Sequence, residues 1–192
     1  MNHLAIDTST NICSVTLYCN SKYNTMKKED ISDHSEYLPI FVNKLLSNDV
    51  KIDFIALNIG PGSFTGLKIG CSFAKGLAKA LNIPIVPIAT FEALKNEITS
   101  SDYFLSIYSH RDFSFYTKIE NGVMGEHKCD KISNFKDEEV FGYGFPKELN
   151  VNYKEIKPCS EKVSIIALEK YNDYKDKSID SINPIYLMQN SK

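Results

Sequence analysis

The stretch from residue 58 to residue 70 reads NIGPGSFTGLKIG, and no other segment constrains the fold as strongly. It continues the apolar run FIALNI at 54–59, which is typical of a strand covered on both faces. A helical pattern over 67–81 follows, and it ends at Asn82 and Pro84. Because glycine permits positive φ and close backbone approach, a demanding strand-to-helix turn is predicted. The predicted loop residues are Gly60, Pro61, Gly62, Ser63 and Thr65, with Ser63 or Thr65 capping the helix.

The composition is that of an ordinary globular chain. Its 192 residues are enough for one large domain or two small ones, with 43% hydrophobic and 24% charged residues. No apolar run approaches about 18 residues and no basic segment opens the chain, so neither a membrane span nor a signal peptide is expected. Five cysteines without a C-x-x-C spacing favour reduced thiols in the cytoplasm. The net charge of −2 argues against strong nucleic-acid binding by this chain alone.

The order of the remaining patterns predicts an α/β protein with mixed sheets. Apolar or alternating runs at 3–6 and 12–18 flank a turn and predict a β-hairpin, and 23–28 is a candidate third strand. A helix is expected over 35–46 and a buried strand over 85–88. Near residue 100 the pattern becomes β-rich, with one late helix. We therefore expect a first lobe over 1–100 and a smaller second lobe over 101–192.

The turn of the first hairpin carries one acid and three hydroxyl groups, at Asp7, Thr8, Ser9 and Thr10. Hydroxyl and backbone N–H groups in such a turn can hold a phosphate, while the aspartate orients a metal-bound water. The same side chains can instead satisfy only the backbone of the turn. The glycine loop has the same two interpretations, because its helix N-terminus can bind an anion or simply close a turn.

Small residues recur every four positions on the helix over 66–81, at Gly66, Gly70 and Ala74. Glycine inside a helix costs about 0.5–1 kcal/mol relative to alanine. Close approach of another helix would offset that cost, either within the domain or from a partner. Core packing alone is the alternative interpretation.

Other chemical signals are sparse. The four histidines are scattered, with no H-x-x-x-H or H-E-x-x-H among them, so no metal site is predicted. No Ser/His/Asp or Cys/His triad can be assembled from the spacing. Arg111 and Asp112 lie between two strand-like runs, where they can position a ligand, bind a partner, or form a solvated turn.

Several segments together resemble the bacterial TsaB family, also called YeaZ. The GPGSFTGLKIG segment is the most specific. Arg111 and Tyr116 resemble an Arg-containing strand motif of the family, and NPIYLMQ resembles its C-terminal motif at Pro184, Tyr186 and Leu187. The other matching segments are AIDTST with CSVTLY, HSEYLPI, IALNI and IPIVPIATFEAL. The chain is shorter than the family norm in the second lobe, and Met188 stands where the family tail usually has arginine.

This resemblance implies an actin/Hsp70/sugar-kinase-like (ribonuclease H-like) fold of two related lobes, the second reduced, with residues 7–10 as the remnant of a phosphate-binding hairpin. It also implies a role in making N6-threonylcarbamoyladenosine at position 37 of tRNA. The catalytic subunit would be a paralogue, TsaD, and a small ATPase, TsaE, would join them. The residue four positions after His34 is Leu38 and not a second histidine. This agrees with a non-catalytic partner that binds no cofactor and meets tRNA only through the complex.

Two helices, 35–46 and 66–81, are expected to pack side by side as the face that binds TsaD, or a second copy of this chain when TsaD is absent. The predicted interface residues are Leu38, Phe41, Val42, Leu45, Gly66, Gly70, Phe73, Ala74 and Leu77. Two alternatives stay open. One is a nucleotide-dependent phosphotransferase that uses residues 7–10, and the other is a metallopeptidase, for which no ligand motif is found.

Overall fold

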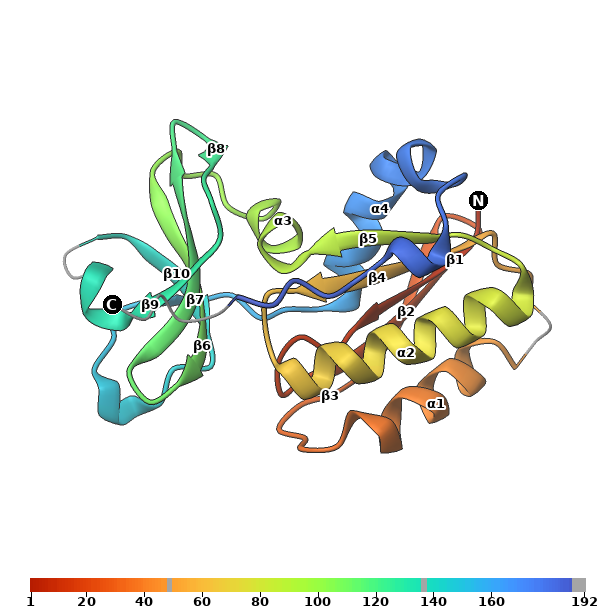
Figure 1. Ribbon diagram of the computed structural model, residues 1–192, viewed down its shortest axis with the longest axis horizontal. Coiled ribbons are helices and arrows are strands. Elements are labelled where there is room, and N and C mark those ends of the chain that lie inside the picture. Colours follow the sequence, from red (N-terminus) through yellow and green to blue (C-terminus); the bar gives the residue numbers. More distant parts are fainter. Residues whose placement is uncertain (48–49, 136–137, 188–192) are drawn as a thin grey trace. The chain divides into compact units, whose positions relative to one another are not determined.

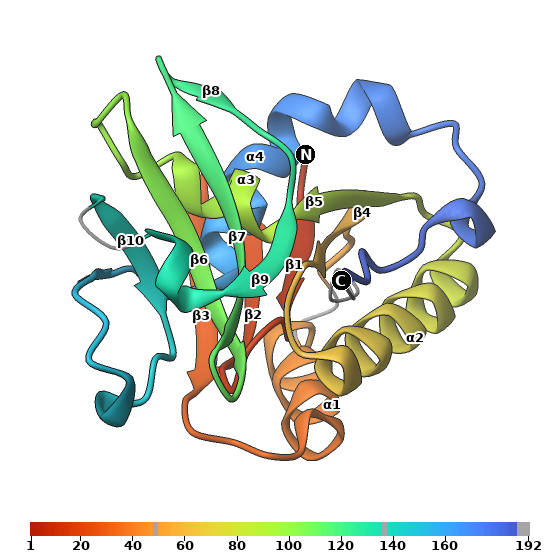
Figure 2. The ribbon, with the colours of Figure 1, turned by 60° about the vertical axis from the view of Figure 1, so that its left-hand side comes forward.

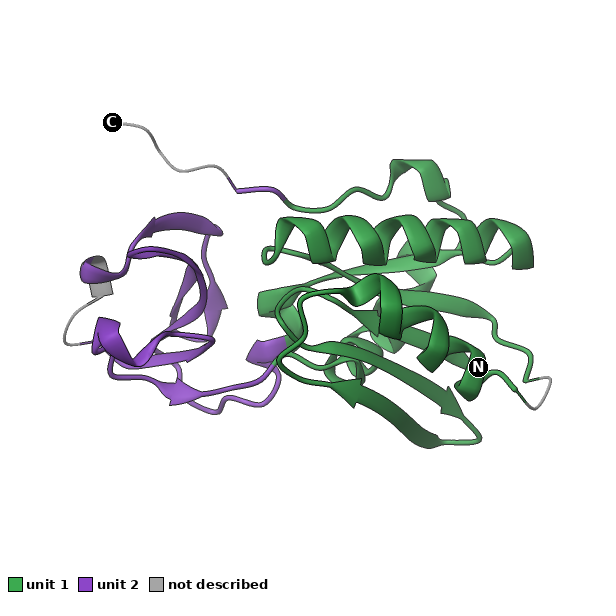
Figure 3. Ribbon diagram, turned by 90° about the horizontal axis from the view of Figure 1, so that it is seen from below, with its two compact units in different colours: residues 1–93, 158–185 green, residues 94–157, 186–192 purple. Residues whose placement is uncertain are grey.

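The computed structural model describes residues 1–47, 50–135 and 138–187, and the chain divides into two compact units (Figures 1 and 3). Unit 1 contains residues 1–93 and 158–185, and unit 2 contains residues 94–157 with the tail from Tyr186. The division differs from a single boundary near residue 100. Residues 158–185 return to unit 1 because the late helix α4 (Ser160–Tyr174) packs on its sheet. Met188 lies outside the described residues.

Unit 1 is built on a five-stranded mixed sheet with the order β3-β2-β1-β4-β5. The predicted hairpin is present, and its strands continue into a third antiparallel strand, whereas β4 and β5 run parallel to β1. The strand bounds are β1 (His3–Asp7), β2 (Cys13–Cys19), β3 (Lys22–Lys28), β4 (Phe54–Gly60) and β5 (Ile85–Ala89).

Helices cover both faces of this sheet. α1 (His34–Leu45) and α2 (Phe64–Leu81) lie side by side on one face, as predicted, and α4 lies on the other (Figures 1 and 2). Alternation along β1 explains this double cover, because Leu4 and Ile6 pack toward α1 and α2 while Ala5 packs toward α4. The short helix α3 (Thr90–Lys95) follows β5 directly.

Local sequence signals set the helix ends. Asp33 caps α1 by accepting a hydrogen bond from Ser35 N (2.8 Å), and Ser63 caps α2 by accepting one from Gly66 N (3.2 Å). Asn82 ends α2 in the left-handed region at φ 53°, two residues before Pro84. The predicted termini of α1 and α2 are therefore correct to within about two residues, except that α2 begins earlier, at Phe64.

Unit 2 repeats the topology of unit 1 in a reduced form. Its sheet has the order β11-β10-β6-β7-β8, with β6, β7 and β8 antiparallel and with β10 and β11 parallel to β6. One turn of 3-10 helix stands where unit 1 has α1 and another stands where it has α2: η1 (Ile132–Phe135) and η2 (Lys147–Leu149). The strand bounds are β6 (Tyr103–His110), β7 (Phe113–Glu120), β8 (Val123–Met124), β9 (Lys128–Lys131), β10 (Val140–Tyr143) and β11 (Lys154–Glu155), and β9 also pairs with β7.

The strand order shows the two related lobes, and the 3-10 turns in place of α1 and α2 show the reduction of the second, which confirms the predicted fold class. A further 3-10 turn, η3 (Ile179–Ser181), lies against α2 in unit 1. Among the helices of the described residues, none combines the length and the apolar character needed to span a bilayer.

Candidate functional site

Asp7 ends β1 at the centre of a buried polar network. Its Oδ1 accepts hydrogen bonds from the backbone N (2.9 Å) and the hydroxyl (2.7 Å) of Ser9, and its Oδ2 accepts one from Asn58 Nδ2 (3.0 Å). Burial raises the pKa of Asp7, while the hydrogen bonds from Ser9 and Asn58 lower it. Both carboxylate oxygens are therefore occupied by groups of the chain itself.

Asn58 connects this network to the glycine loop. A bulge in β4 at Asn58 lets its Oδ1 accept a hydrogen bond from Gly60 N (2.8 Å), and the Thr90 hydroxyl lies 2.8 Å from the same oxygen. Sequence reasoning did not single out Asn58 or Thr90. The available signal was one polar residue inside the otherwise apolar run FIALNI.

The glycine loop lies directly on the first hairpin. Ser63 N donates to Ser9 O (2.7 Å), and a Cβ built on Gly62 would lie 2.2 Å from that same oxygen. Gly60 has φ +100°, which only glycine adopts readily, so the predicted need for a special backbone is confirmed there. Thr65 is exposed in the first turn of α2, and the capping residue is Ser63.

The ridge of Gly66, Gly70 and Ala74 packs against its own chain, which corrects the expectation that it faces a partner helix. A Cβ on Gly66 would lie 2.1 Å from Thr8 O, and one on Gly70 would lie 2.3 Å from Thr8 Oγ1. Ala74 is fully buried in the core of unit 1. The absence of side chains at Gly66 and Gly70 therefore lets Thr8 of the first hairpin lie directly against α2 within one lobe.

The other predicted interface residues divide into two groups. Four of them face the core of unit 1 and are buried: Leu38, Phe41, Val42 and Leu45. Phe73 and Leu77 are only partly buried. The two helices also carry Ile40, 44% exposed, and Phe64, 55% exposed. Tyr37 and Ile69, like Phe73 and Leu77, are partly buried and pack against the rim of the core. We call these six residues the outer helical face: Tyr37, Ile40, Phe64, Ile69, Phe73 and Leu77.

The hydroxyl-rich hairpin is enclosed by these contacts. Thr8 and Ser9 are fully buried, and the exposed fraction is 2% at Asp7 and 8% at Thr10. The Thr8 hydroxyl donates to Gly66 O (2.8 Å), and Thr10 Oγ1 accepts from Ile12 N (3.3 Å). In the structure, side chains of the hairpin thus satisfy polar groups of the turn itself. Their binding to a phosphate stays a prediction.

His34 opens α1 beneath the same hairpin. Its Nε2 donates to Thr10 O (2.9 Å), its Nδ1 is buried without a partner among the described residues, and burial lowers its pKa. The side chain four residues later, Leu38, is buried in the core. Within residues 1–47, 50–135 and 138–187, no three His, Cys, Asp or Glu side chains come together as a metal site.

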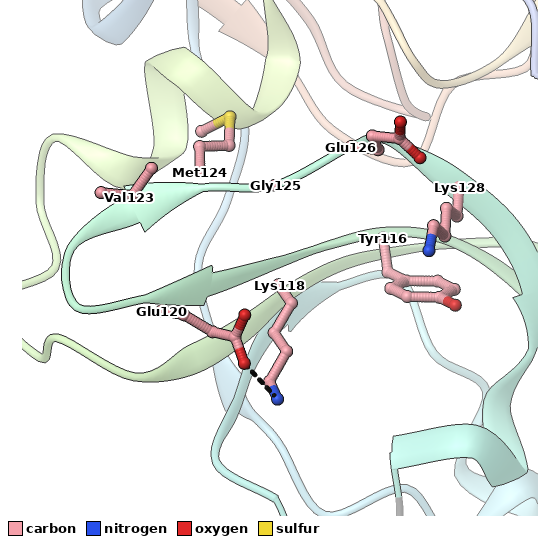
Figure 4. Close-up of a pocket in the computed structure, with 8 residues that line it drawn as sticks. All are labelled: Tyr116, Lys118, Glu120, Val123, Met124, Gly125, Glu126 and Lys128. Atoms are coloured by element: carbon pink, nitrogen blue, oxygen red, sulfur yellow. Dashed lines mark ion pairs between the residues drawn. The ribbon is translucent and has the colours of Figure 1, made fainter.

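Arg111 and Tyr116 lie in unit 2. Arg111 is exposed at the two-residue turn between β6 and β7 and has φ +51°, whereas Asp112 pairs with Lys131 across 4.0 Å. The turn between the two strands is confirmed. Tyr116 lines a pocket on β7 (Figure 4).

His3 is a buried titratable group that the sequence patterns did not reveal. Its ring stacks on Phe54 with 4.4 Å between centroids, and its Nε2 lies 2.6 Å from the Ser164 hydroxyl of α4. The pKa of His3 is lowered from 6.5 to about 4, mainly by burial and also by the N-terminal amine, while Asp53 opposes the shift.

We expect this histidine to make the fold acid-sensitive. The unfolded chain binds a proton at His3 near pH 6.5 and the folded chain only near pH 4, so the free energy of unfolding should fall as the pH drops through that window. The loss should reach about 3 kcal/mol at pH 4. Urea titrations between pH 4 and 7.5 should show a slope that His3→Gln reduces by about one proton. The exposed His110→Gln is the control, and equal slopes in all three proteins would contradict the prediction.

The sequence of this chain is similar to those of proteins that act in the modification of tRNA. A family model described as TsaD, tRNA N6-adenosine threonylcarbamoyltransferase, matches residues 28–109. The tRNA threonylcarbamoyladenosine biosynthesis protein TsaB of Haemophilus influenzae is 33% identical over 95 residues, which are 47% of this chain and 40% of that protein. The TsaB protein of Escherichia coli is 24% identical over 223 residues, covering 99% of this chain and 96% of that protein.

Solved structures agree over nearly the whole chain. A structure described as YeaZ from Pseudomonas aeruginosa has a TM-score of 0.75 at 22% identity and covers 97% of this chain and 99% of its own. A second Pseudomonas aeruginosa structure, of an uncharacterized protein with similarity to peptidase YEAZ, has a TM-score of 0.78 with the same identity and coverage. At this identity the likeness concerns the fold.

Two lobes that repeat one mixed-sheet topology, with a hydroxyl-rich hairpin after the first strand, define the class of actin-like and sugar-kinase-like α/β proteins. The TsaB relatives match this chain over almost its full length, and the YeaZ structures share its fold. The chain is thus similar to the TsaB proteins, also called YeaZ, in sequence and in fold.

Proposed function

We propose that this chain is an accessory subunit in the synthesis of N6-threonylcarbamoyladenosine in tRNA. The names of its TsaB relatives support this pathway. In our proposal the chemistry belongs to a TsaD-type transferase, which this chain binds and supports together with a TsaE-type ATPase. With a net charge of −2 and no basic field, the chain would meet tRNA only through the complex.

A single observation carries the accessory role: in the first lobe the hairpin is packed by the chain itself, while the helices beside it present apolar side chains to solvent. The hydroxyl of Thr8 is bonded to Gly66 O, and Gly62 lies against Ser9 O. Large apolar side chains left in water on neighbouring helices are typical of a binding surface. Ile40 and Phe64 are the most exposed of these.

The proposed occupant of the outer helical face is the corresponding face of a TsaD-type subunit. Residues 28–109, which match the TsaD family model, include both α1 and α2. A paralogue with the same two helices would present a similar face, so the pair can meet with near two-fold symmetry. For the same reason a second copy of this chain can take that place when TsaD is absent.

The interface is tested with Ile40→Glu and Phe73→Glu. Each change puts a charge into the outer helical face, and a desolvated unpaired carboxylate should weaken the TsaD complex at least about 100-fold. Calorimetric titration with a TsaD-type subunit measures the affinity, and thermal melting followed by circular dichroism checks that each variant folds. Tyr23→Glu is the control, because Tyr23 is a 39% exposed aromatic residue on the edge strand β3. If both folded variants bind like the parent protein, the interface is elsewhere.

The pathway has its own test. A cell lacking its TsaB subunit should regain N6-threonylcarbamoyladenosine, measured by mass spectrometry of tRNA nucleosides, when it expresses this chain with its cognate TsaD and TsaE. Unchanged nucleoside levels, with all three proteins present in the extract, would reject the proposed function.

A further inference from the structure

A pocket of about 510 Å³ in unit 2 has no part in the accessory role (Figure 4). It lies between β7 and the segment that leaves β8 and returns as β9. Its lining residues all come from positions 116 to 128: Tyr116, Lys118, Glu120, Val123, Met124, Gly125, Glu126 and Lys128.

Hydrogen bonds to the backbone of Gly125 and of β7 fix the shape of this pocket. Gly125 N donates to Lys118 O (2.9 Å), and the Thr117 hydroxyl donates to Gly125 O (3.0 Å). Lys128 then pairs with Tyr116 in the antiparallel register of β9 and β7. The segment between Gly125 and Lys128 is therefore anchored at both ends, and the hollow exists before any ligand enters it.

An aromatic ring forms one wall. Tyr116 is partly buried in a small cluster with Phe104, whose ring centroid lies 5.9 Å away, and with Val140. This packing fixes the ring in place. Figure 4 shows the side chain of Lys128 pointing toward that ring, so a cation and an aromatic surface lie next to each other in the pocket.

The charges limit what the pocket can hold. Lys118 is already neutralised by Glu120 at 2.8 Å, whereas Lys128 has no ion-pair partner among the described residues. Glu126 adds a negative charge to the rim. A polyphosphate would therefore meet one available ammonium and two carboxylates, while a single carboxylate can pair with Lys128 alone.

We propose that this pocket binds a small aromatic monocarboxylate, with its ring against Tyr116 and its carboxylate at the ammonium of Lys128. The ring contributes apolar burial and stacking, and the ion pair fixes the orientation. The site shares no residue with the outer helical face and does not depend on the proposed function.

Nuclear magnetic resonance titration of the full-length ¹⁵N-labelled protein tests the proposal, with phenylacetate as the probe. Saturable shifts should gather on the pocket residues, with a dissociation constant of about 1 mM or tighter. Acetate, which lacks the ring, and AMP, which carries about two negative charges, should each bind at least about tenfold more weakly.

Lys128→Gln should weaken phenylacetate binding at least about tenfold, because it removes the charge and retains a side chain of similar shape. Lys147→Gln, at an exposed lysine outside the pocket, is the matched control. The proposal is overturned if shifts do not saturate by about 10 mM, if they lie elsewhere, if Lys128→Gln binds normally, or if AMP binds more tightly.

Discussion

Gly66→Ala should destabilise the first lobe by about 3 kcal/mol or more, although alanine is the better helix former. The added methyl would lie 2.1 Å from the carbonyl oxygen of Thr8 and 3.0 Å from His34 Nε2. Thr8 is fully buried and its O belongs to the backbone of the hairpin, so it cannot turn aside as a flexible side chain would. Relief requires α2 to move away from the sheet, which disrupts the core between them.

Gly76→Ala in the same helix is the matched control. Nothing lies within 4 Å of a Cβ at Gly76, so only helix propensity changes and the variant should be more stable by about 0.5–1 kcal/mol. Urea unfolding followed by circular dichroism at 222 nm measures both variants. Opposite signs at the two glycines support the intramolecular contact. A stabilised Gly66→Ala variant would show that the ridge is open and would revive its use as a partner surface.

Asn58→Leu should destabilise the chain by about 3–5 kcal/mol at neutral pH. Leucine has a similar volume, but it removes the amide that donates to Asp7 Oδ2 and the oxygen that accepts from Gly60 N. Asp7 is left as a buried carboxylate with one fewer donor, and Gly60 N loses its acceptor. The cost of an uncompensated buried charge dominates over the gain from a more apolar side chain.

The loss at Asn58 should depend on pH. Burial raises the pKa of Asp7, so its unfavourable ionisation in the folded state is absent below the unfolded value of 3.8 and grows as the pH rises through the folded pKa. Without the Asn58 donor that pKa rises further. The difference between parent and Asn58→Leu should therefore be larger at pH 7 than near pH 4.

Two further variants isolate the carboxylate. Adding Asp7→Ala to Asn58→Leu should recover part of the stability, because it removes the charge that Asn58 satisfied. Asn172→Leu, at an exposed position of α4, should change the unfolding free energy by less than about 0.5 kcal/mol. A pH-independent loss, or no recovery in the double variant, would show that Asp7 is not the group that Asn58 stabilises.

Local signals in the sequence determined most of the first lobe. The apolar run before Gly60, the capping residue Ser63 and the ending at Asn82 predicted β4 and α2, because each depends on residues within a few positions. The short strands β9, β10 and β11 were not predicted. They have two to four residues each, which is too few to show a period. They form because neighbouring strands provide edges for pairing: β7 for β9, β6 for β10 and β10 for β11.

The tertiary structure alone decided which surface the small residues of α2 serve. Their spacing required a close neighbour but did not identify that neighbour, since any backbone fits against a ridge without side chains. Thr8 precedes Gly66 by 58 positions, and only the parallel pairing of β1 with β4 brings that hairpin against the helix. The same pairing brings Asp7 to Asn58, so a contact between residues distant in the chain depends on the assembled sheet, whereas a helix end depends on its own turn.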